Sequence, residues 1–230
     1  GFEPLPAIDS WEPTSNDKIL ITGGTSGIGL KLGRALEARG GKVALLSRSE
    51  PSGEVAEWIA ESDNVEWVQA DVTNFNGLRE AVENAGPFTA LLHCAGVLAD
   101  GPLGSVSSEQ GYLARAVKVR GWLASLAACG DTLERAVAVG SWAGRFGNRH
   151  QAHYAAANAM LAASVDIINN DVRTSVVEFG PWTNTDMAST IPDAVRATMR
   201  NEGTDFVDDE PGIEALLESL GGEEGVCVRG

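Results

Sequence analysis

Seven short apolar runs alternate with stretches of helical character from Lys18 to the end of the chain. The runs cover residues 18–22, 42–47, 65–69, 88–93, 135–140, 172–178 and 225–229. The helical stretches between them cover residues 27–40, 53–61, 75–85, 106–128, 151–169 and 209–220. Strands that alternate with helices pair in parallel, because each helix returns the chain to the start of the next strand. The pattern therefore predicts an α/β fold, a doubly wound parallel sheet of about seven strands with helices on both faces.

The chain length of 230 residues suits one well-buried domain, and 43% of the residues are hydrophobic. Residues 1–17 contain three prolines and no periodic apolar pattern, so we expect a linker or edge segment there and one domain over residues 18–230. Because the chain opens with glycine rather than methionine, we also expect that it was excised or processed.

The formal net charge is −15, which argues against nucleic acid and against anionic membrane surfaces as partners. The first seventeen residues lack basic residues and a long apolar core, so neither a signal peptide nor a membrane span is predicted. A cytoplasmic location is the expectation that remains.

The three cysteines, Cys94, Cys129 and Cys227, show no Cys-x-x-Cys spacing. We expect free thiols in a reducing compartment rather than disulfides. His150 and His153 lie close together, but no further histidine or cysteine near them completes a ligand set, so no metal site is predicted.

A glycine-rich turn follows the first apolar run and opens the first helical stretch. Its residues are Thr22, Gly23, Gly24, Thr25, Ser26, Gly27, Ile28 and Gly29. Glycines let the backbone approach a pyrophosphate, and the positive end of the following helix attracts it. The turn predicts a dinucleotide site in a Rossmann-like fold.

The second apolar run ends at Ser47 and Arg48, with no acidic residue to bind a ribose 2′-hydroxyl. An arginine at this strand end suits a 2′-phosphate and favours NADPH over NADH, although Arg48 would also suit a solvated loop. Asp71 follows the third run and has two interpretations, a contact with the adenine or a cap on the next helix.

Polar residues also follow the later runs. Ser141 ends the fifth run, and Tyr154 and Asn158 lie four residues apart on one face of a predicted helix. Lys118 is the only lysine after Lys42. A phenol with a pKa of ~10 donates a proton slowly at neutral pH unless a nearby cation lowers that pKa. Without further information, Lys118 also fits an exposed helix residue and Ser141 a turn residue.

These motifs resemble the short-chain dehydrogenase/reductase superfamily, and in particular the ketoreductase domains of type I polyketide and fatty-acid synthases. The resemblance runs from about Lys18 to the C-terminus. In most of the superfamily the lysine lies four residues after the tyrosine, whereas the synthase ketoreductases exchange lysine and asparagine. Here Asn158 follows Tyr154 and Lys118 lies earlier, in Lys118-Val-Arg-Gly121.

The resemblance implies NADPH-dependent reduction of a β-ketoacyl thioester on the phosphopantetheine arm of an acyl carrier protein. Tyr154 would donate the proton, Ser141 would hold the carbonyl oxygen, Lys118 would bind the nicotinamide ribose and lower the pKa of Tyr154, and Asn158 would position Lys118 or a water. Other domains of a multidomain synthase are expected partners. The remaining implied cofactor contacts are Ser47, Arg48, Asp71, Val72, Cys94, Ala95, Gly96, Pro181 and Trp182.

The resemblance also implies a substrate lid near residues 183–205, which show no strong apolar register, and four residues of stereocontrol. These four are Leu98, Asp100, Phe146 and Met187. Leu98-Ala-Asp100 resembles the Leu-x-Asp motif of the B type, and Phe146 takes the position where the opposite type carries tryptophan. We therefore predict the D-configured (3R) β-hydroxyacyl product.

Two departures leave alternatives open. Phe179 stands where the family usually has tryptophan, and only seventeen residues precede the first strand, so the cofactor-free half of modular ketoreductases is missing or was removed. The alternatives are a free-standing reductase of a small ketone or acyl-CoA, and a non-catalytic nucleotide-binding domain.

Arg145 and Arg149 are predicted to dock the acidic carrier protein.

Overall fold

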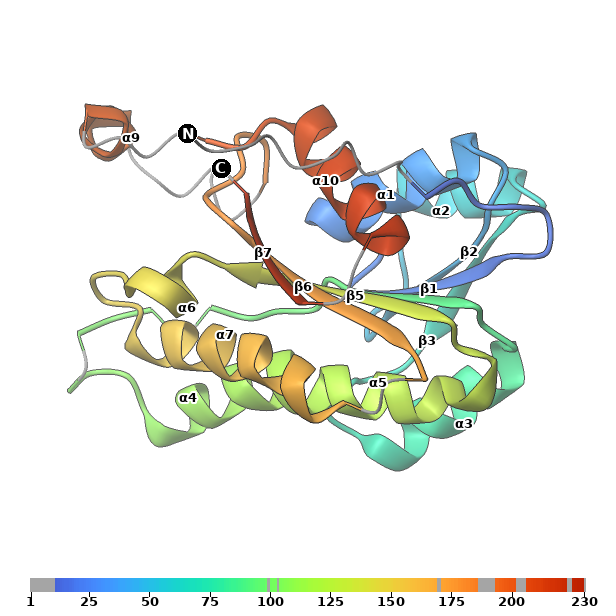
Figure 1. Ribbon diagram of the computed structural model, residues 1–230, viewed down its shortest axis with the longest axis horizontal. Coiled ribbons are helices and arrows are strands. Elements are labelled where there is room, and N and C mark those ends of the chain that lie inside the picture. Colours follow the sequence, from blue (N-terminus) through green and yellow to red (C-terminus); the bar gives the residue numbers. More distant parts are fainter. Residues whose placement is uncertain are drawn as a thin grey trace.

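The computed structural model describes residues 11–98, 100–102, 104–168, 171–185, 193–201, 206–222 and 225–229. In these parts of the chain seven strands form one parallel sheet in the order β3-β2-β1-β4-β5-β6-β7 (Figure 1). The strands are β1 (Lys18–Thr22), β2 (Lys42–Ser47), β3 (Val65–Gln69), β4 (Ala90–His93), β5 (Arg135–Ser141), β6 (Arg173–Phe179) and β7 (Gly225–Arg229). The predicted α/β fold with a seven-stranded parallel sheet is confirmed.

Helices cover both faces of the sheet (Figure 1). One face packs against α1 (Gly27–Ala38), α2 (Glu54–Glu61) and α10 (Asp209–Gly221). The other packs against α3 (Phe75–Ala85), α5 (Gly121–Cys129) and α7 (Ala152–Ser164), and α4 (Ser108–Arg115) packs against α7. Successive strand residues alternate between the faces, so Ile19 and Ile21 join one core cluster and Leu20 joins the other. Both clusters are apolar because a parallel sheet is buried on both sides.

The long helix expected over residues 106–128 contains a wider turn. Between α4 and α5 the chain forms the π-helical turn η1 (Ala116–Arg120), in which Ala116 to Val119 are buried. Such a turn inserts one extra residue into a helix and is common at functional sites. The periodicity of the sequence did not reveal it.

Other helix ends differ from the expected ranges by a few residues. The first helix stops at Ala38 because Gly40 takes a φ of +86°, a left-handed conformation that ends helices. The helix expected to reach residue 169 stops at Ser164 and continues as the 3₁₀ turn η3 (Val165–Ile167). The chain also forms the 3₁₀ turn η2 (Gly130–Thr132) and two unpredicted helices, α6 (Ala143–Phe146) and α9 (Asp193–Asn201). The second of these lies within the predicted lid.

Residues 11–17 form neither helix nor strand and lie against the domain. The backbone N–H of Trp11 donates to Leu217 O in α10 (3.1 Å), and the guanidinium of Arg135 stacks over the Trp11 ring at 5.1 Å. This segment therefore closes the core beside α10.

The order of the strands creates a crevice at one edge of the sheet. From β1 the chain adds β2 and β3 on one side and then crosses to β4 on the other side. The loops after β1 and β4 diverge at this point, where doubly wound sheets bind their ligands.

Candidate active site

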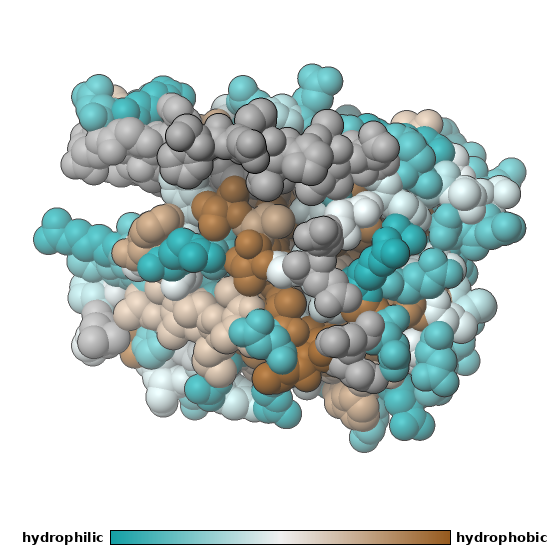
Figure 2. Space-filling model, in the orientation of Figure 1, coloured by the Kyte–Doolittle hydropathy of each residue, from teal (hydrophilic) through white to brown (hydrophobic). Residues whose placement is uncertain are grey.

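A cavity of about 1030 Å³ occupies the carboxyl edge of the sheet at this crevice. Segments that follow β1, β2, β3, β4, β5 and β6 all contribute to its wall. Figure 2 shows apolar residues gathered in the middle of the face that it presents. The predicted residues that line the cavity are Gly23, Thr25, Ser26, Gly27, Ile28, Gly29, Ser47, Arg48, Asp71, Val72, Cys94, Ala95, Gly96, Leu98, Asp100, Lys118, Ser141, Phe146, Tyr154, Pro181 and Trp182.

Two glycines of the turn have no room for a side chain, and two others take a left-handed backbone conformation. Gly23 and Gly27 adopt φ of +66° and +51°, which favours glycine. A Cβ on Gly29 would lie 2.4 Å from Gly23 O, and one on Gly24 would lie 2.8 Å from Ile21 O. The start of α1 therefore packs directly on the turn.

The N-terminus of α1 suits an anion. Ser26 caps the helix only by its backbone position, because its side chain makes no capping hydrogen bond, and the first turn contains no acidic residue. The first N–H groups of the helix point their partial positive charge at the cavity wall formed by Gly27, Ile28 and Gly29. This is the arrangement that a pyrophosphate requires.

Thr22 and Gly24 belong to the predicted turn but do not line the cavity. Thr22 is fully buried, and its Oγ1 lies 2.8 Å from His93 Nδ1. Burial and then the charge of Lys118 lower the pKa of His93 to about 3, so this ring stays neutral. The pair joins the ends of β1 and β4.

The residues after β2 and β3 form the far end of the cavity. Arg48 is exposed at its rim, while its carbonyl accepts a hydrogen bond from Gln69 Nε2 (3.2 Å). Asp71 lines the wall and accepts from Thr73 N (2.8 Å) and Thr73 Oγ1 (2.7 Å). The side-chain cap of α3 is Asn74, so Asp71 holds the preceding turn and does not cap the helix.

The π-helical turn η1 places Lys118 in the cavity wall. Its ammonium donates to Ala95 O (3.3 Å), and a Cβ on Gly96 would lie 3.2 Å from Nζ. Lys118 is 5% exposed, and burial lowers its pKa to about 8, with Cys94 acting weakly in the opposite direction. The structure therefore excludes the exposed-helix interpretation of Lys118.

Ser141 and Tyr154 meet on the same wall. Ser141 Oγ accepts a hydrogen bond from Ala143 N (3.2 Å) and also hydrogen-bonds the Tyr154 side chain. Burial raises the pKa of Tyr154, hydrogen bonds with Ser141 and Asn158 oppose this, and the charge of Asp100 adds to it. Burial outweighs these hydrogen bonds, so the pKa of Tyr154 is raised rather than lowered as expected, and the phenol is protonated at neutral pH.

Asn158 lies behind the tyrosine rather than on the cavity wall. It is fully buried, and its Nδ2 donates to the backbone oxygen of Tyr154 (2.9 Å). Its Oδ1 is buried and has no hydrogen-bond partner among the described residues. The amide thus holds one turn of α7 and presents a free acceptor next to the site.

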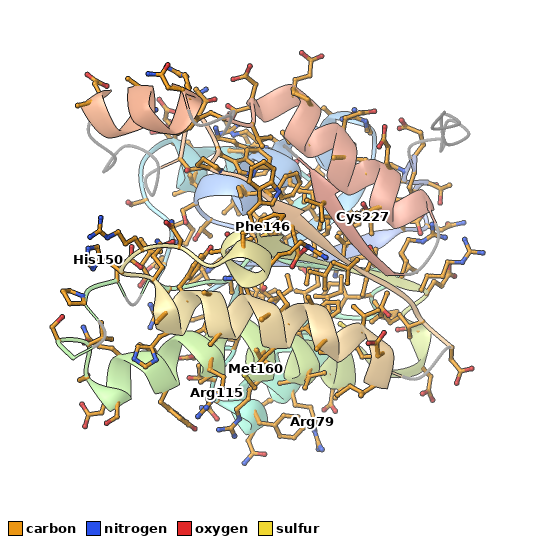
Figure 3. The ribbon with its side chains drawn as sticks, turned by 60° about the vertical axis from the view of Figure 1, so that its left-hand side comes forward. Arg79, Arg115, Phe146, His150, Met160 and Cys227 are labelled. Carbon is orange, nitrogen blue, oxygen red and sulfur yellow. The ribbon has the colours of Figure 1, made fainter. Side chains whose placement is uncertain are left out.

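Two loops that were predicted to control stereochemistry touch each other. Gln151 Nε2 donates to Asp100 Oδ2 (2.9 Å), and Gly101 N donates to His150 O (2.7 Å). Leu98 and Phe146 both line the cavity and are 40% and 71% exposed. Figure 3 shows Phe146 at α6. Met187 lies outside the described residues, as does much of the predicted lid.

Several cavity residues were not predicted from the sequence. Trp142 and Val228 add apolar surface, and the Trp142 ring meets Phe146 edge-on at 6.2 Å. Gln151 contributes an amide three residues before Tyr154. The position of Trp142 directly after Ser141 was a usable signal, whereas nothing in the sequence around Val228 links it to this cavity.

The two arginines that were predicted to dock a carrier protein have different surroundings. Arg145 Nε donates to Glu178 Oε2 at 2.8 Å, and Glu178 is 2% exposed. Arg149 is exposed, and its backbone N–H donates to Asn148 Oδ1. Arg145 is therefore committed to a buried carboxylate.

The described residues contain no group of three potential metal ligands and no helix long and apolar enough to cross a membrane. The three cysteines are free thiols, and burial raises the pKa of Cys94 and of Cys129 to about 12. Neither thiol is a nucleophile at neutral pH.

Known proteins share this sequence pattern and fold. Polyketide synthase GfsB of Streptomyces halstedii is 32% identical over 226 residues, which are 94% of this chain and 4% of that protein. The ketoreductase PlmKR1, from the first module of phoslactomycin biosynthesis in Streptomyces sp. HK803, has a TM-score of 0.83 and 26% identity, covering 98% of this chain and 54% of that one.

A blue fluorescent protein from a metagenomic library, solved in complex with NADPH, has a TM-score of 0.79 at 24% identity and covers 93% of this chain and 96% of that one. This likeness shows the fold alone. The family model of the KR domain matches residues 18–184. The chain belongs to the KR family, the ketoreductase domains of polyketide synthases within the short-chain dehydrogenase/reductase superfamily.

Proposed function

We propose that this chain reduces a β-ketoacyl thioester, carried on an acyl carrier protein, to the β-hydroxyacyl thioester with NADPH. The observation that carries the proposal is the meeting of Ser141 and Tyr154 in a cavity that the buried Lys118 and the glycine turn also line. A nucleotide-binding domain without activity would need only the glycine turn.

The cavity fits NADPH at both ends. The turn of Gly23 to Gly29 offers backbone N–H groups to the pyrophosphate. A side chain at Gly29 would collide with Gly23 O, so glycine is required at this position. Exposed Arg48 is available for a 2′-phosphate, and the turn held by Asp71 faces the adenine. Lys118 would hold the nicotinamide ribose, and Pro181 and Trp182 would lie against the ring.

When bound, NADPH supplies the hydride that adds to the β-carbonyl carbon. Ser141 would donate a hydrogen bond to the carbonyl oxygen, since its Oγ accepts from Ala143 N and its hydroxyl proton can turn from Tyr154 to the substrate. Tyr154 gives its proton to the developing alkoxide. Its raised pKa keeps the phenol protonated until this step.

The ammonium of Lys118 stabilises the phenolate that remains after proton transfer. At the low effective dielectric of a buried site this attraction is stronger than in water. Asn158 presents its free Oδ1 to Lys118 or to a water that returns the proton to Tyr154.

The carrier protein would approach at the rim formed by Leu98, Asp100, Gly101 and residues 146–150. Arg149 is the exposed cation there, and we assign the docking role to Arg149 alone, because Arg145 is held by Glu178. Leu98, Asp100 and Phe146 would steer the pantetheine arm in the B-type direction.

Oxidation of NADPH with decalone, a simple cyclic ketone, tests the activity itself. We expect turnover with NADPH and at least about tenfold lower kcat/KM with NADH, if Arg48 binds the 2′-phosphate. Absence of ketone-dependent oxidation would remove the catalytic proposal and leave a nucleotide-binding domain.

Carrier-bound and free thioesters then separate the proposed function from a free-standing reductase. Arg149→Glu is expected to lower kcat/KM for the carrier-bound substrate several-fold and to leave decalone unaffected. Equal kcat/KM for carrier-bound and free thioester would instead identify a reductase that does not use a carrier.

A further inference from the structure

The pair Arg145–Glu178 joins the segment after β5 to the next strand of the sheet. Glu178 is the only carboxylate among the buried residues of the described chain, and Arg145 Nε donates to its Oε2 at 2.8 Å. The Arg145 side chain is 45% exposed. By contrast, the side chains of the pair Arg79–Glu83 on α3 are both 58% exposed.

The sheet directs the Glu178 side chain beneath α6. Glu178 follows Val176 by two residues in β6 and shares its face of the sheet, the face that α7 covers. In the neighbouring strand Gly140 lies opposite Glu178, and a Cβ there would be 3.3 Å from Glu178 Cγ. Because Gly140 has no side chain, the charged side chain of Glu178 fits on a face of β6 where its neighbour Val176 is apolar.

A buried carboxylate requires a partner, and α6 supplies it. This helix has a single turn, Ala143–Phe146, and no side-chain cap, so it is too short to be stable on its own. Two bonds tie it to β6: Trp142 N donates to Phe179 O (2.9 Å), and the Arg145 side chain donates to Glu178. Consecutive residues of one strand thus hold both ends of α6.

The position of α6 sets the hydroxyl of Ser141. Ala143, the first residue of α6, donates its N–H to Ser141 Oγ, and Phe146, the last one, lines the cavity. If α6 moves, Ser141 Oγ no longer accepts the hydrogen bond from Ala143 N, and the hydroxyl is free to rotate away from Tyr154. Arg145 itself does not line the cavity, so it can act only through this helix.

We propose that Arg145 and Glu178 are positioning residues, which fix α6 and thereby hold the Ser141 hydroxyl in the geometry that the reduction needs. The inference rests on the proposed ketone reduction and adds to it a pair of residues that do not touch substrate or cofactor.

The test separates positioning from stability. Arg145→Met leaves Glu178 buried without its counterion, whereas Glu178→Met leaves an arginine that reaches water, so we expect the first variant to have the lower Tm. In the double variant no buried charge remains, and Tm returns close to that of the wild type. Its kcat with decalone is nevertheless expected to stay roughly tenfold lower, with an NADPH Kd within about twofold of the wild type.

Arg79→Met is the matched control, because it also removes an arginine from an ion pair but lies on α3, away from α6 (Figure 3). It is expected to keep both kcat and Tm. A double variant with wild-type Tm and wild-type kcat would overturn the inference, and so would an equal loss of kcat in Arg79→Met.

A crystal structure of the double variant provides a readout that does not depend on activity. We expect α6 to be displaced and the bond between Ala143 N and Ser141 Oγ to be lost; an unmoved α6 with this bond intact contradicts the inference. A wild-type protein that reduces no ketone contradicts the proposed function instead.

Discussion

The two halves of the cavity are built by opposite means. After β1 the wall is the backbone of the glycine turn, in which a Cβ on Gly29 would lie 2.4 Å from Gly23 O. After β4 and β5 the wall carries polar side chains that other groups hold: Lys118 by Ala95 O and Ser141 by Ala143 N. A backbone wall suits a ligand that is the same in every reaction, whereas a side-chain wall can be changed residue by residue.

Loss of the Tyr154 hydroxyl gives the largest expected effect and breaks only the side-chain half. Tyr154→Phe keeps the ring and its packing, so NADPH binding is expected to persist while turnover falls by at least ~10²-fold. Pre-steady-state reduction of decalone together with fluorescence titration of NADPH measures both. Turnover within a few-fold of the wild type would mean that another group supplies the proton.

Replacement of Lys118 is expected to lower activity and raise stability at the same time. Burial lowers the pKa of Lys118 from 10.5 to about 8, which corresponds to about 3 kcal/mol of unfolding free energy. Between these pH values the unfolded state binds more protons than the folded state, so wild-type stability rises as the pH rises from about 8 to about 10.5.

Lys118→Met removes this titration. We expect the variant to be more stable than the wild type at pH 7, and the difference to disappear by about pH 10.5, while turnover falls roughly tenfold or more. Urea unfolding at several pH values measures the stability. A variant that is less stable at pH 7 would show that the ammonium stabilises the fold.

Gly29→Ala breaks the backbone half instead. The new Cβ would lie 2.4 Å from Gly23 O, so the turn must move away from α1. We expect a loss of about 1–3 kcal/mol in unfolding free energy and roughly tenfold weaker NADPH binding. Gly104→Ala is the control, since a Cβ there meets nothing within 4 Å and we expect no change. Unchanged NADPH affinity in Gly29→Ala would show that the turn adapts.

The stereochemistry of the product gives the smallest expected effect and tests the role of the side chains at the rim of the cavity. We expect the wild type to form mainly the D-configured (3R) product, and Leu98→Ala to lower the ratio of D to L a few-fold while kcat changes little. Leu98 is 40% exposed on the cavity wall, so the change removes steering surface and no core packing. Chiral chromatography against both standards reads the ratio. A wild type that forms mainly L product would overturn the B-type assignment.

The sequence by itself determined the sheet, its seven strands and most of the cavity wall. Apolar runs and glycines act locally: Ile19 to Ile21 are buried, and Gly24 and Gly29 in the turn that follows have no room for a side chain. Because parallel strands bring their carboxyl ends to one edge, the sequence alone assigns the residues after each run to one site.

Only the tertiary structure determined the contacts between segments that are distant in the sequence. The π-helical turn around Lys118 has no separate periodic signal, and α6 is too short to be predicted from periodicity. Burial set the direction of the Tyr154 pKa, against the expectation from Lys118 alone. The pairing of Arg145 with Glu178 joins residues 33 positions apart, and such a contact depends on the register of β5 with β6, which a sequence pattern does not encode.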